Sequence, residues 1–206
     1  DFTERDRYLV TVFSAQAAVA IQRARLITTT LETTRTKEQL AIGRKIQQSL
    51  LPDILPEIPG YASHAVFLPA EQVAGDLYDL FPIRDGAWGI MIGDATGHGV
   101  GAALIGAEGR ALIRGLVAAQ EDLGRVIRQA NDILASNLPE EKFITVFLGV
   151  LEPAYHRLCY ISAGQAPLLL FRAGEGRIET LDATGIPLGM ITSFPYSDPK
   201  EILFEP

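Results

Sequence analysis

The sequence has little of what marks several protein classes. Its 206 residues include one cysteine, Cys159, which excludes an internal disulfide framework and indicates a reducing, cytoplasmic setting. It has no signal peptide and no apolar run of 18 or more residues, so we expect no membrane span in this chain. Basic residues are in the minority, at 18 Lys and Arg against 25 Asp and Glu, and the net charge of −7 argues against a nucleic-acid partner.

The composition is that of a chain with a packed core. Apolar residues make up 48% of the sequence, so a sizeable core can be buried. The length allows one full domain plus an appendage. Because the chain begins with Asp1 and not with methionine, we expect it to be a fragment of a longer protein.

Glycine and proline are both absent before Gly43, which predicts that the first part of the chain is helical. Apolar residues recur there at alternating spacings of three and four, at Val10, Phe13, Ala17, Ala20, Ala24, Ile27 and Leu31. We refer to these seven residues as the seam. A seam of this kind favours packing against a partner helix, so we predict a parallel two-helix stalk and a homodimer. The alternative is a solvent-covered helix that packs on its own domain.

The helical pattern changes before it ends. Residues 28–39 are threonine-rich and charged, and a second amphipathic piece follows with Ile42, Ile46 and Leu50 spaced four apart. Prolines at positions 52, 56 and 59 end it. We therefore predict two parts, a helical, coiled-coil linker at residues 1–51 and a folded domain at residues 52–206.

The second part is predicted to be α+β. Short apolar or aromatic-rich segments predict strands at residues 62–68, 76–83, 87–93, 145–151, 157–162, 167–171 and 178–181, and longer patterns predict helices at 100–119 and 123–137. The sequence Arg84-Asp85-Gly86 between the second and third strands is typical of a hairpin turn. Strands, then two helices, then more strands indicate an antiparallel sheet and not alternating βαβ units.

Two Gly-Asp pairs carry the candidate chemistry. Gly75-Asp76 opens a predicted strand, and Gly93-Asp94 ends the next one just before a helix. If these strands pair, Asp76 and Asp94 converge, and two carboxylates about 4 Å apart repel by several kcal/mol unless a cation compensates. Mg²⁺ and Mn²⁺ prefer such oxygen ligands, so the pattern indicates a metal or acid–base site. The alternative is that each aspartate is a turn residue.

Three other kinds of site, for a dinucleotide, for a serine hydrolase and for zinc, fit the sequence less well. Residues 97–102 match G-x-G-x-x-A, but a second helix follows where a dinucleotide-binding fold needs a strand. No G-x-S-x-G motif marks a serine hydrolase, and His64, His98 and His156 lack the paired spacing of a zinc site. His98, within the glycine loop, is the histidine that we expect nearest to an active site, and the other two are expected on the surface.

Seven sequence blocks point to one family. In order they are residues 46–52, 69–79, 93–104, Asn131, and residues 143–147, 162–167 and 185–189. Together they resemble the sporulation stage II protein E family, the bacterial branch of the metal-dependent protein phosphatase (PPM) superfamily. Phe13–Leu26 is similar to the last helix of a GAF sensor domain.

The resemblance implies an αββα sandwich of antiparallel sheets flanked by helices, with a two-metal centre between the sheets. It implies that Asp94 bridges two Mn²⁺ or Mg²⁺ ions, that the carbonyl of Ala95 is a ligand, and that Asp76 contributes mainly through water. Metal-activated water would then hydrolyse phosphoserine or phosphothreonine on a phosphorylated STAS-type anti-anti-sigma protein, under the control of the upstream sensor. The alternative is an inactive phosphatase-fold module that only binds or scaffolds partners.

The sequence departs from the family in three places. Gln165 stands where the family has histidine, and Val-Ala-Gly replaces the commoner Val-Gly-Gly before Asp76. The later segment that supplies the family's remaining metal carboxylates does not occur in this sequence. We therefore expect weak metal binding and little turnover from this chain by itself.

Overall fold

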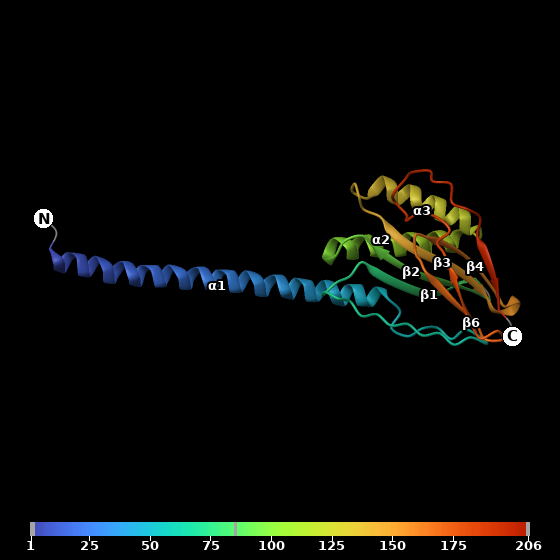
Figure 1. Cartoon of the computed structure of the whole chain (residues 1–206), viewed down its shortest axis with the longest axis horizontal. Helices are drawn as coiled ribbons and strands as arrows, with labels where there is room; N and C mark the ends of the chain where they lie inside the picture. The colour runs from blue at the N-terminus through green and yellow to red at the C-terminus, as the bar shows by residue number, and fades with distance from the viewer. Residues whose placement is uncertain (1–2, 85, 205–206) are drawn as a thin grey trace. The chain divides into compact units, whose positions relative to one another are not determined.

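The structure is a computed structural model that describes residues 3–84 and 86–204. Its elements are a long helix, then two strands, two helices and five more strands (Figure 1). They are α1 (Glu4–Leu50), β1 (Asp76–Arg84), β2 (Ala87–Ala95), α2 (Gly99–Ala119), α3 (Leu123–Asn137), β3 (Ile144–Glu152), a 3-10 turn (Pro153–Tyr155), β4 (Arg157–Ala163), β5 (Leu168–Arg172), β6 (Arg177–Leu181) and β7 (Lys200–Leu203). The α+β prediction is confirmed.

Helix α1 is continuous over 47 residues. Its threonine-rich part does not interrupt it, and threonine hydroxyls there donate to carbonyls four residues back, as from Thr30 to Leu26 at 2.8 Å and from Thr33 to Thr29 at 2.8 Å. The chain divides into two compact units, of which one ends at Ile42 and the other begins at Gly43. The last turns of α1 therefore belong to the unit that contains the sheet.

None of the described helices is long and apolar enough to cross a bilayer.

A five-stranded antiparallel sheet organises the larger unit. Its strand order is β1-β2-β3-β4-β7, so the first four strands are neighbours in sequence and in space. The predicted hairpin between β1 and β2 is confirmed by their pairing, although Asp85 lies outside the described residues. Strand β7 at the far edge is a short element that the sequence pattern did not predict.

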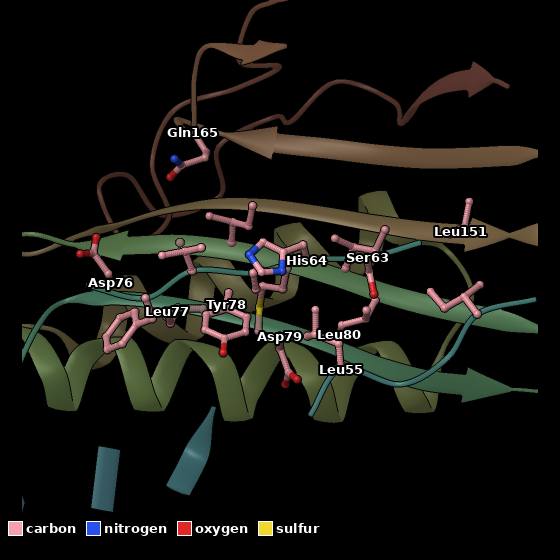
Figure 2. A pocket seen from close by; sticks show the side chains of 18 of the residues that line it. Leu55, Ser63, His64, Asp76, Leu77, Tyr78, Asp79, Leu80, Leu151 and Gln165 are labelled. Carbon is pink, nitrogen blue, oxygen red and sulfur yellow. The ribbon is translucent and has the colours of Figure 1, made fainter. Parts of the chain in front are cut away.

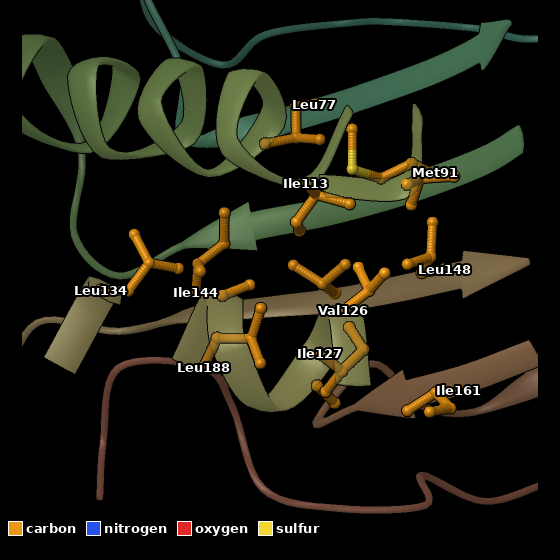
Figure 3. Close-up of a cluster of buried hydrophobic side chains, with 14 of the residues drawn as sticks. Leu77, Met91, Ile113, Val126, Ile127, Leu134, Ile144, Leu148, Ile161 and Leu188 are labelled. Atoms are coloured by element: carbon orange, nitrogen blue, oxygen red, sulfur yellow. The ribbon is translucent and has the colours of Figure 1, made fainter. Parts of the chain in front are cut away.

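Helices α2 and α3 cover one face of the sheet (Figure 1). Alternate strand residues point toward them and form the larger core, which Figure 3 shows in part. Its fully buried members include Met91, Ile113, Val126, Ile127, Ile144, Leu148, Ile161 and Leu188. This core holds the sheet and both helices together as one packed layer pair.

The opposite face of the sheet carries a smaller core. Leu80, Phe147 and Tyr160 are buried there, and the hairpin of β5 and β6 packs its inward-facing leucines onto them. The second sheet of the implied sandwich thus consists of two strands within the described residues.

The predicted strand at residues 62–68 is wrong. That segment runs without regular structure, and no strand pairs with it in the part of the chain that the structure describes. Its apolar side chains are left largely in solvent, with Val66 67% and Leu68 85% exposed. An apolar, β-branched pattern forms a strand only where a neighbouring backbone satisfies its N–H and C=O groups.

Candidate metal centre

Asp76 lies directly opposite Asp94 in the β1–β2 pair. Side chains of directly opposed residues project on the same face of a sheet and lie close together. Leu77 and Asp79 point to the helices, so alternation turns Asp76 and Asp94 to the other face, where both are exposed. The structure therefore brings the two predicted carboxylates together.

The two carboxylates influence each other. Partial desolvation raises the pKa of Asp94, and the negative charge of Asp76 and a hydrogen bond that protonated Asp94 donates to Asp76 raise it further. Each of these effects penalises the ionised form of Asp94 when Asp76 is also ionised. Such a pair gains stability from either a shared proton or a cation.

Gly75 lies between the predicted ligands. The N–H of Ala95 donates to the carbonyl oxygen of Gly75 at 3.2 Å, which ties the loop before β1 to the end of β2. A Cβ built on Gly75 would lie 2.5 Å from the carbonyl oxygen of Ala95 and 3.2 Å from Oδ1 of Asp94. A side chain at this position would therefore displace two of the three groups predicted to bind metal.

The donor set fits a hard divalent cation. Two carboxylates and a backbone carbonyl are the oxygen ligands that Mg²⁺ and Mn²⁺ prefer, and Mg²⁺ keeps several waters when protein ligands are few. Within residues 3–84 and 86–204, no group of three or more His, Cys, Asp or Glu side chains is placed to hold a metal. Asp76, Asp94 and the carbonyl of Ala95 are thus the groups that we predict to hold such an ion.

A groove of about 550 Å³ extends from the aspartate pair along the sheet. The faces of β1 and β2 form its floor, and residues 61–68 line one side. Figure 2 shows Asp76 and Leu151 toward opposite ends of it, with His64 and Ser63 over its middle. Most lining side chains are apolar, so the aspartates form the polar end of a largely apolar surface.

Gln165, which replaces the family's histidine, lies in this groove. The hydroxyl of Thr145 donates to its Oε1 at 2.7 Å and lies 3.3 Å from the carbonyl oxygen of Asp94. The hydroxyl of Ser162 donates to the backbone carbonyl of Gln165. These contacts fix a neutral amide near the predicted metal ligands, and an amide does not change charge near neutral pH.

One of the three histidines, His98, lies differently from what the sequence suggested. His98, expected nearest to the active site, precedes α2 and pairs with Glu71 at 3.2 Å while its side chain is 86% exposed. It does not line the groove, whereas His64, expected on the surface, is exposed and does line it. Gly97 and Gly99, on either side of His98, both adopt positive φ, a conformation that favours glycine.

Sequence reasoning missed two supports of the site. Asp79 is an ion-pair partner of Arg110 and Arg114 on α2, and the side chain of Gln47 binds the backbone of Ala74. Asp79 and Gln47 both lie in the sequence blocks shared with the family. The blocks therefore signalled that the residues matter, but not which groups they contact.

The comparisons with known proteins point to one family. The family model described as Stage II sporulation protein E (SpoIIE) matches residues 84–205, more than half of the chain. Protein IcfG of Synechocystis sp. (strain ATCC 27184 / PCC 6803 / Kazusa) is 31% identical over 198 residues, which cover 80% of this chain and 31% of IcfG. Phosphoserine phosphatase RsbU of Bacillus subtilis (strain 168) is 26% identical over 160 residues, which cover 78% of this chain and 48% of RsbU.

Among solved structures, the SiaA-PP2C domain of Pseudomonas aeruginosa has the same fold. Its TM-score is 0.66 at 18% identity, over 84% of this chain and 69% of that domain. The chain spans less than half the length of the two curated relatives, 31% of IcfG and 48% of RsbU. The similarity therefore concerns one portion of longer proteins.

Proposed function

Since this chain belongs to the stage II sporulation protein E (SpoIIE) family, we propose that its sheet-containing unit is the phosphatase portion of a protein serine/threonine phosphatase. The observation that carries the proposal is the register that sets Asp76 opposite Asp94. A paired carboxylate centre at the polar end of a groove suits hydrolysis of a phosphate monoester. The similarity to RsbU, a phosphoserine phosphatase, supports the same reaction.

Asp76, Asp94 and the carbonyl of Ala95 hold Mn²⁺ or Mg²⁺ in this proposal. A divalent ion there supplies Lewis-acid chemistry, because it neutralises phosphoryl oxygens and makes water a stronger nucleophile. The residues of the chain concentrate negative charge to attract the ion, and the backbone around Gly75 fixes the spacing of the ligands. The amide of Gln165 is placed to orient a bound phosphoprotein without taking up a proton.

The substrate we propose is a phosphorylated STAS-type anti-anti-sigma protein, as membership of this partner-switching family suggests. An extended protein segment fits the apolar groove beside the aspartates better than a small polar metabolite does, because most of the lining is apolar. A sensor upstream of α1 would control the reaction. Nucleic acid is disfavoured as a ligand by the net charge of −7.

We also propose that the chain forms a homodimer through α1. The helix has no buried residue among those described, and its seam includes Val10, Phe13, Ile27 and Leu31, all exposed. An exposed helix with an apolar seam at heptad spacing is stabilised by a second copy of itself.

A phosphatase assay tests the proposal. The longer protein that contains this sequence is expected to release phosphate from a phosphoserine protein in the presence of Mn²⁺, and Asp94→Asn is expected to lower the rate by about a hundredfold or more. Asp53→Asn, which replaces an exposed aspartate elsewhere, serves as the control. Equal rates for the Asp94 variant and the unmodified protein contradict the proposal.

A second candidate is a phosphatase-fold module that binds partners without turnover. The observation in its favour is the neutral amide of Gln165 in the groove, where the resemblance implies a histidine. This candidate predicts partner binding that does not depend on divalent ions. Calorimetric titration with Mn²⁺ separates the two, because an ion-dependent enzyme gives a binding isotherm that Asp94→Asn abolishes.

A further inference from the structure

The side chain of Gln47, near the end of α1, forms two hydrogen bonds with the backbone of one residue. Its Nε2 donates to the carbonyl oxygen of Ala74 at 2.5 Å, and its Oε1 accepts from the N–H of Ala74 at 3.1 Å. A primary amide that binds one residue in both directions copies the pairing of a neighbouring β-strand. Gln47 is half-buried, and so this pairing is partly shielded from water.

A contact at Ala74 can influence the position of Asp76. It lies in the irregular segment before β1, two residues before Asp76. On the opposite side, the next residue, Gly75, accepts a hydrogen bond from the N–H of Ala95. The approach to Asp76 is therefore held from two sides, by the helix through Gln47 and by β2 through Ala95.

Apolar and polar contacts keep the end of α1 in line with this segment. A Cβ built on Gly43 would lie 3.7 Å from Cγ1 of Val73, which shows how closely the helix approaches. Leu51, just after the helix, is buried in the larger core. The hydroxyl of Tyr78 donates to the carbonyl of Pro52 at 3.1 Å. Helix end and strand entry thus run beside each other from residue 43 to residue 52, with Gln47 in the middle.

We propose that Gln47 is a positioning residue that sets the place of Asp76 relative to Asp94, and thereby sets the affinity for the divalent ion. This inference rests on the proposed function, since it concerns the same ligands. Gln47 touches neither the ion nor the substrate. Because it is part of a helix that continues without a break to Glu4, a shift or rotation of the last turns of α1 would be passed to Asp76 through Ala74.

The test is Mn²⁺ binding followed by electron paramagnetic resonance of free Mn²⁺, which needs no turnover. Gln47→Leu keeps the size and helix propensity of the side chain and removes both hydrogen bonds. We expect it to weaken Mn²⁺ binding about tenfold, the usual lower effect of losing a group that orients a metal ligand. Gln48→Leu makes the same change on the exposed next residue and is expected to bind Mn²⁺ like the unmodified chain.

Gln47→Glu tests whether a loss of side-chain packing alone explains the result. It keeps the shape and the acceptor for the N–H of Ala74, but it sets a carboxylate against the carbonyl oxygen of Ala74. We expect Mn²⁺ binding to weaken as with Gln47→Leu, and the metal-free melting temperature to fall somewhat below that of Gln48→Leu, because two acceptors face each other. A lower melting temperature with unchanged Mn²⁺ affinity would make Gln47 merely structural and overturn the inference.

The outcomes separate the two proposals. If Asp94→Asn abolishes Mn²⁺ binding and both Gln47 variants bind normally, the positioning role is overturned and the phosphatase proposal stands. If the longer protein that contains this sequence and its Asp94→Asn variant show the same lack of Mn²⁺ binding, the metal centre itself is refuted, and the role of Gln47 falls with it.

Discussion

Asp79 of β1 and Arg110 of α2 form an ion pair of 2.9 Å in which the carboxylate is almost completely buried. Arg114, one helical turn further on, donates to the same oxygen at 2.8 Å and also lies over the ring of Phe81 at 4.6 Å. Burial lowers the pKa of Arg110, and the charge of Asp79 opposes that effect. This cluster joins the strand of the candidate ligand Asp76 to the helix beside it.

Removal of the buried carboxylate is expected to be costly. Asp79→Ala leaves Arg110 and Arg114 facing each other without a counter-charge, so we expect the free energy of unfolding to fall by about 3–5 kcal/mol. Urea denaturation measures this change in the free energy of unfolding. Arg177→Ala breaks pairs with Glu175 and Glu179 on an exposed hairpin and should cost less than about 1 kcal/mol. A similar cost for the two variants would show that the Asp79 cluster contributes little.

Asn131 supports the loop at residues 189–191 and provides a second prediction. It is fully buried, its Oδ1 accepts from the N–H of Gly189 at 3.1 Å, and its Nδ2 donates to the carbonyl of Ile191 at 2.8 Å. Asn131→Leu leaves both backbone groups without their partner, at a cost of about 2–4 kcal/mol. Thermal unfolding should show a clear drop, whereas Asn137→Leu at the exposed end of α3 should change little.

The raised pKa of Asp94 predicts a pH effect in the absence of metal. Because the folded state disfavours the ionised form, the penalty is present above the folded-state pKa and is relieved as pH falls through it. At pH 7 without metal, Asp94→Asn should therefore melt about 1–2 °C above the unmodified chain. The difference should shrink toward pH 4, and added Mn²⁺ should stabilise only the unmodified chain. Asp53→Asn is the matched control, and a lower melting temperature for the Asp94 variant at pH 7 contradicts the prediction.

The local sequence pattern predicted most of the helices and strands in the sheet-containing unit. The predicted helix at residues 123–137 matches α3 because its apolar residues face one way and Asp122 caps its start by accepting from the N–H of Arg125 at 3.0 Å. Strand β7 was missed because its residues 200–203 alternate too briefly and include Lys200 and Glu201. Whether such an edge strand forms depends on the strand that it pairs with, here β4, which lies far away in the sequence.

The metal centre shows where pattern alone falls short. The pair Arg84 and Ala87 closes the hairpin, and an unbroken ladder from there would set Asp76 opposite Ala95. A register shift between Pro82 and Arg84 moves the pairing by one residue and sets Asp76 opposite Asp94. A slip of one residue exchanges the faces of a strand, so this irregularity decides whether the carboxylates meet. The sequence predicted the pair of aspartates but could not predict the bulge.

Close approach at Gly75 gives a fourth prediction. Gly75→Ala sets a Cβ against the carbonyl oxygen of Ala95, so we expect a loss of about 2–4 kcal/mol in the free energy of unfolding and much weaker Mn²⁺ binding. Gly115→Ala is the matched control, because a Cβ there meets nothing within 4 Å and the residue lies inside α2. That variant should gain about 0.5–1 kcal/mol. Equal stability of the two variants would refute the packing argument.

The seam on α1 gives the last prediction. Ala20 and Ile27 lie on the seam, so a double change to Glu sets charges against each other in a dimer and should give monomers by sedimentation velocity. Gln22→Glu with Thr29→Glu adds the same charge away from the seam and should leave the dimer intact. Both doubles add two negative charges to an exposed helix, so a difference between them reports packing and not net charge. A monomeric unmodified chain, or equal dissociation of the two doubles, would show that α1 does not pair through this seam.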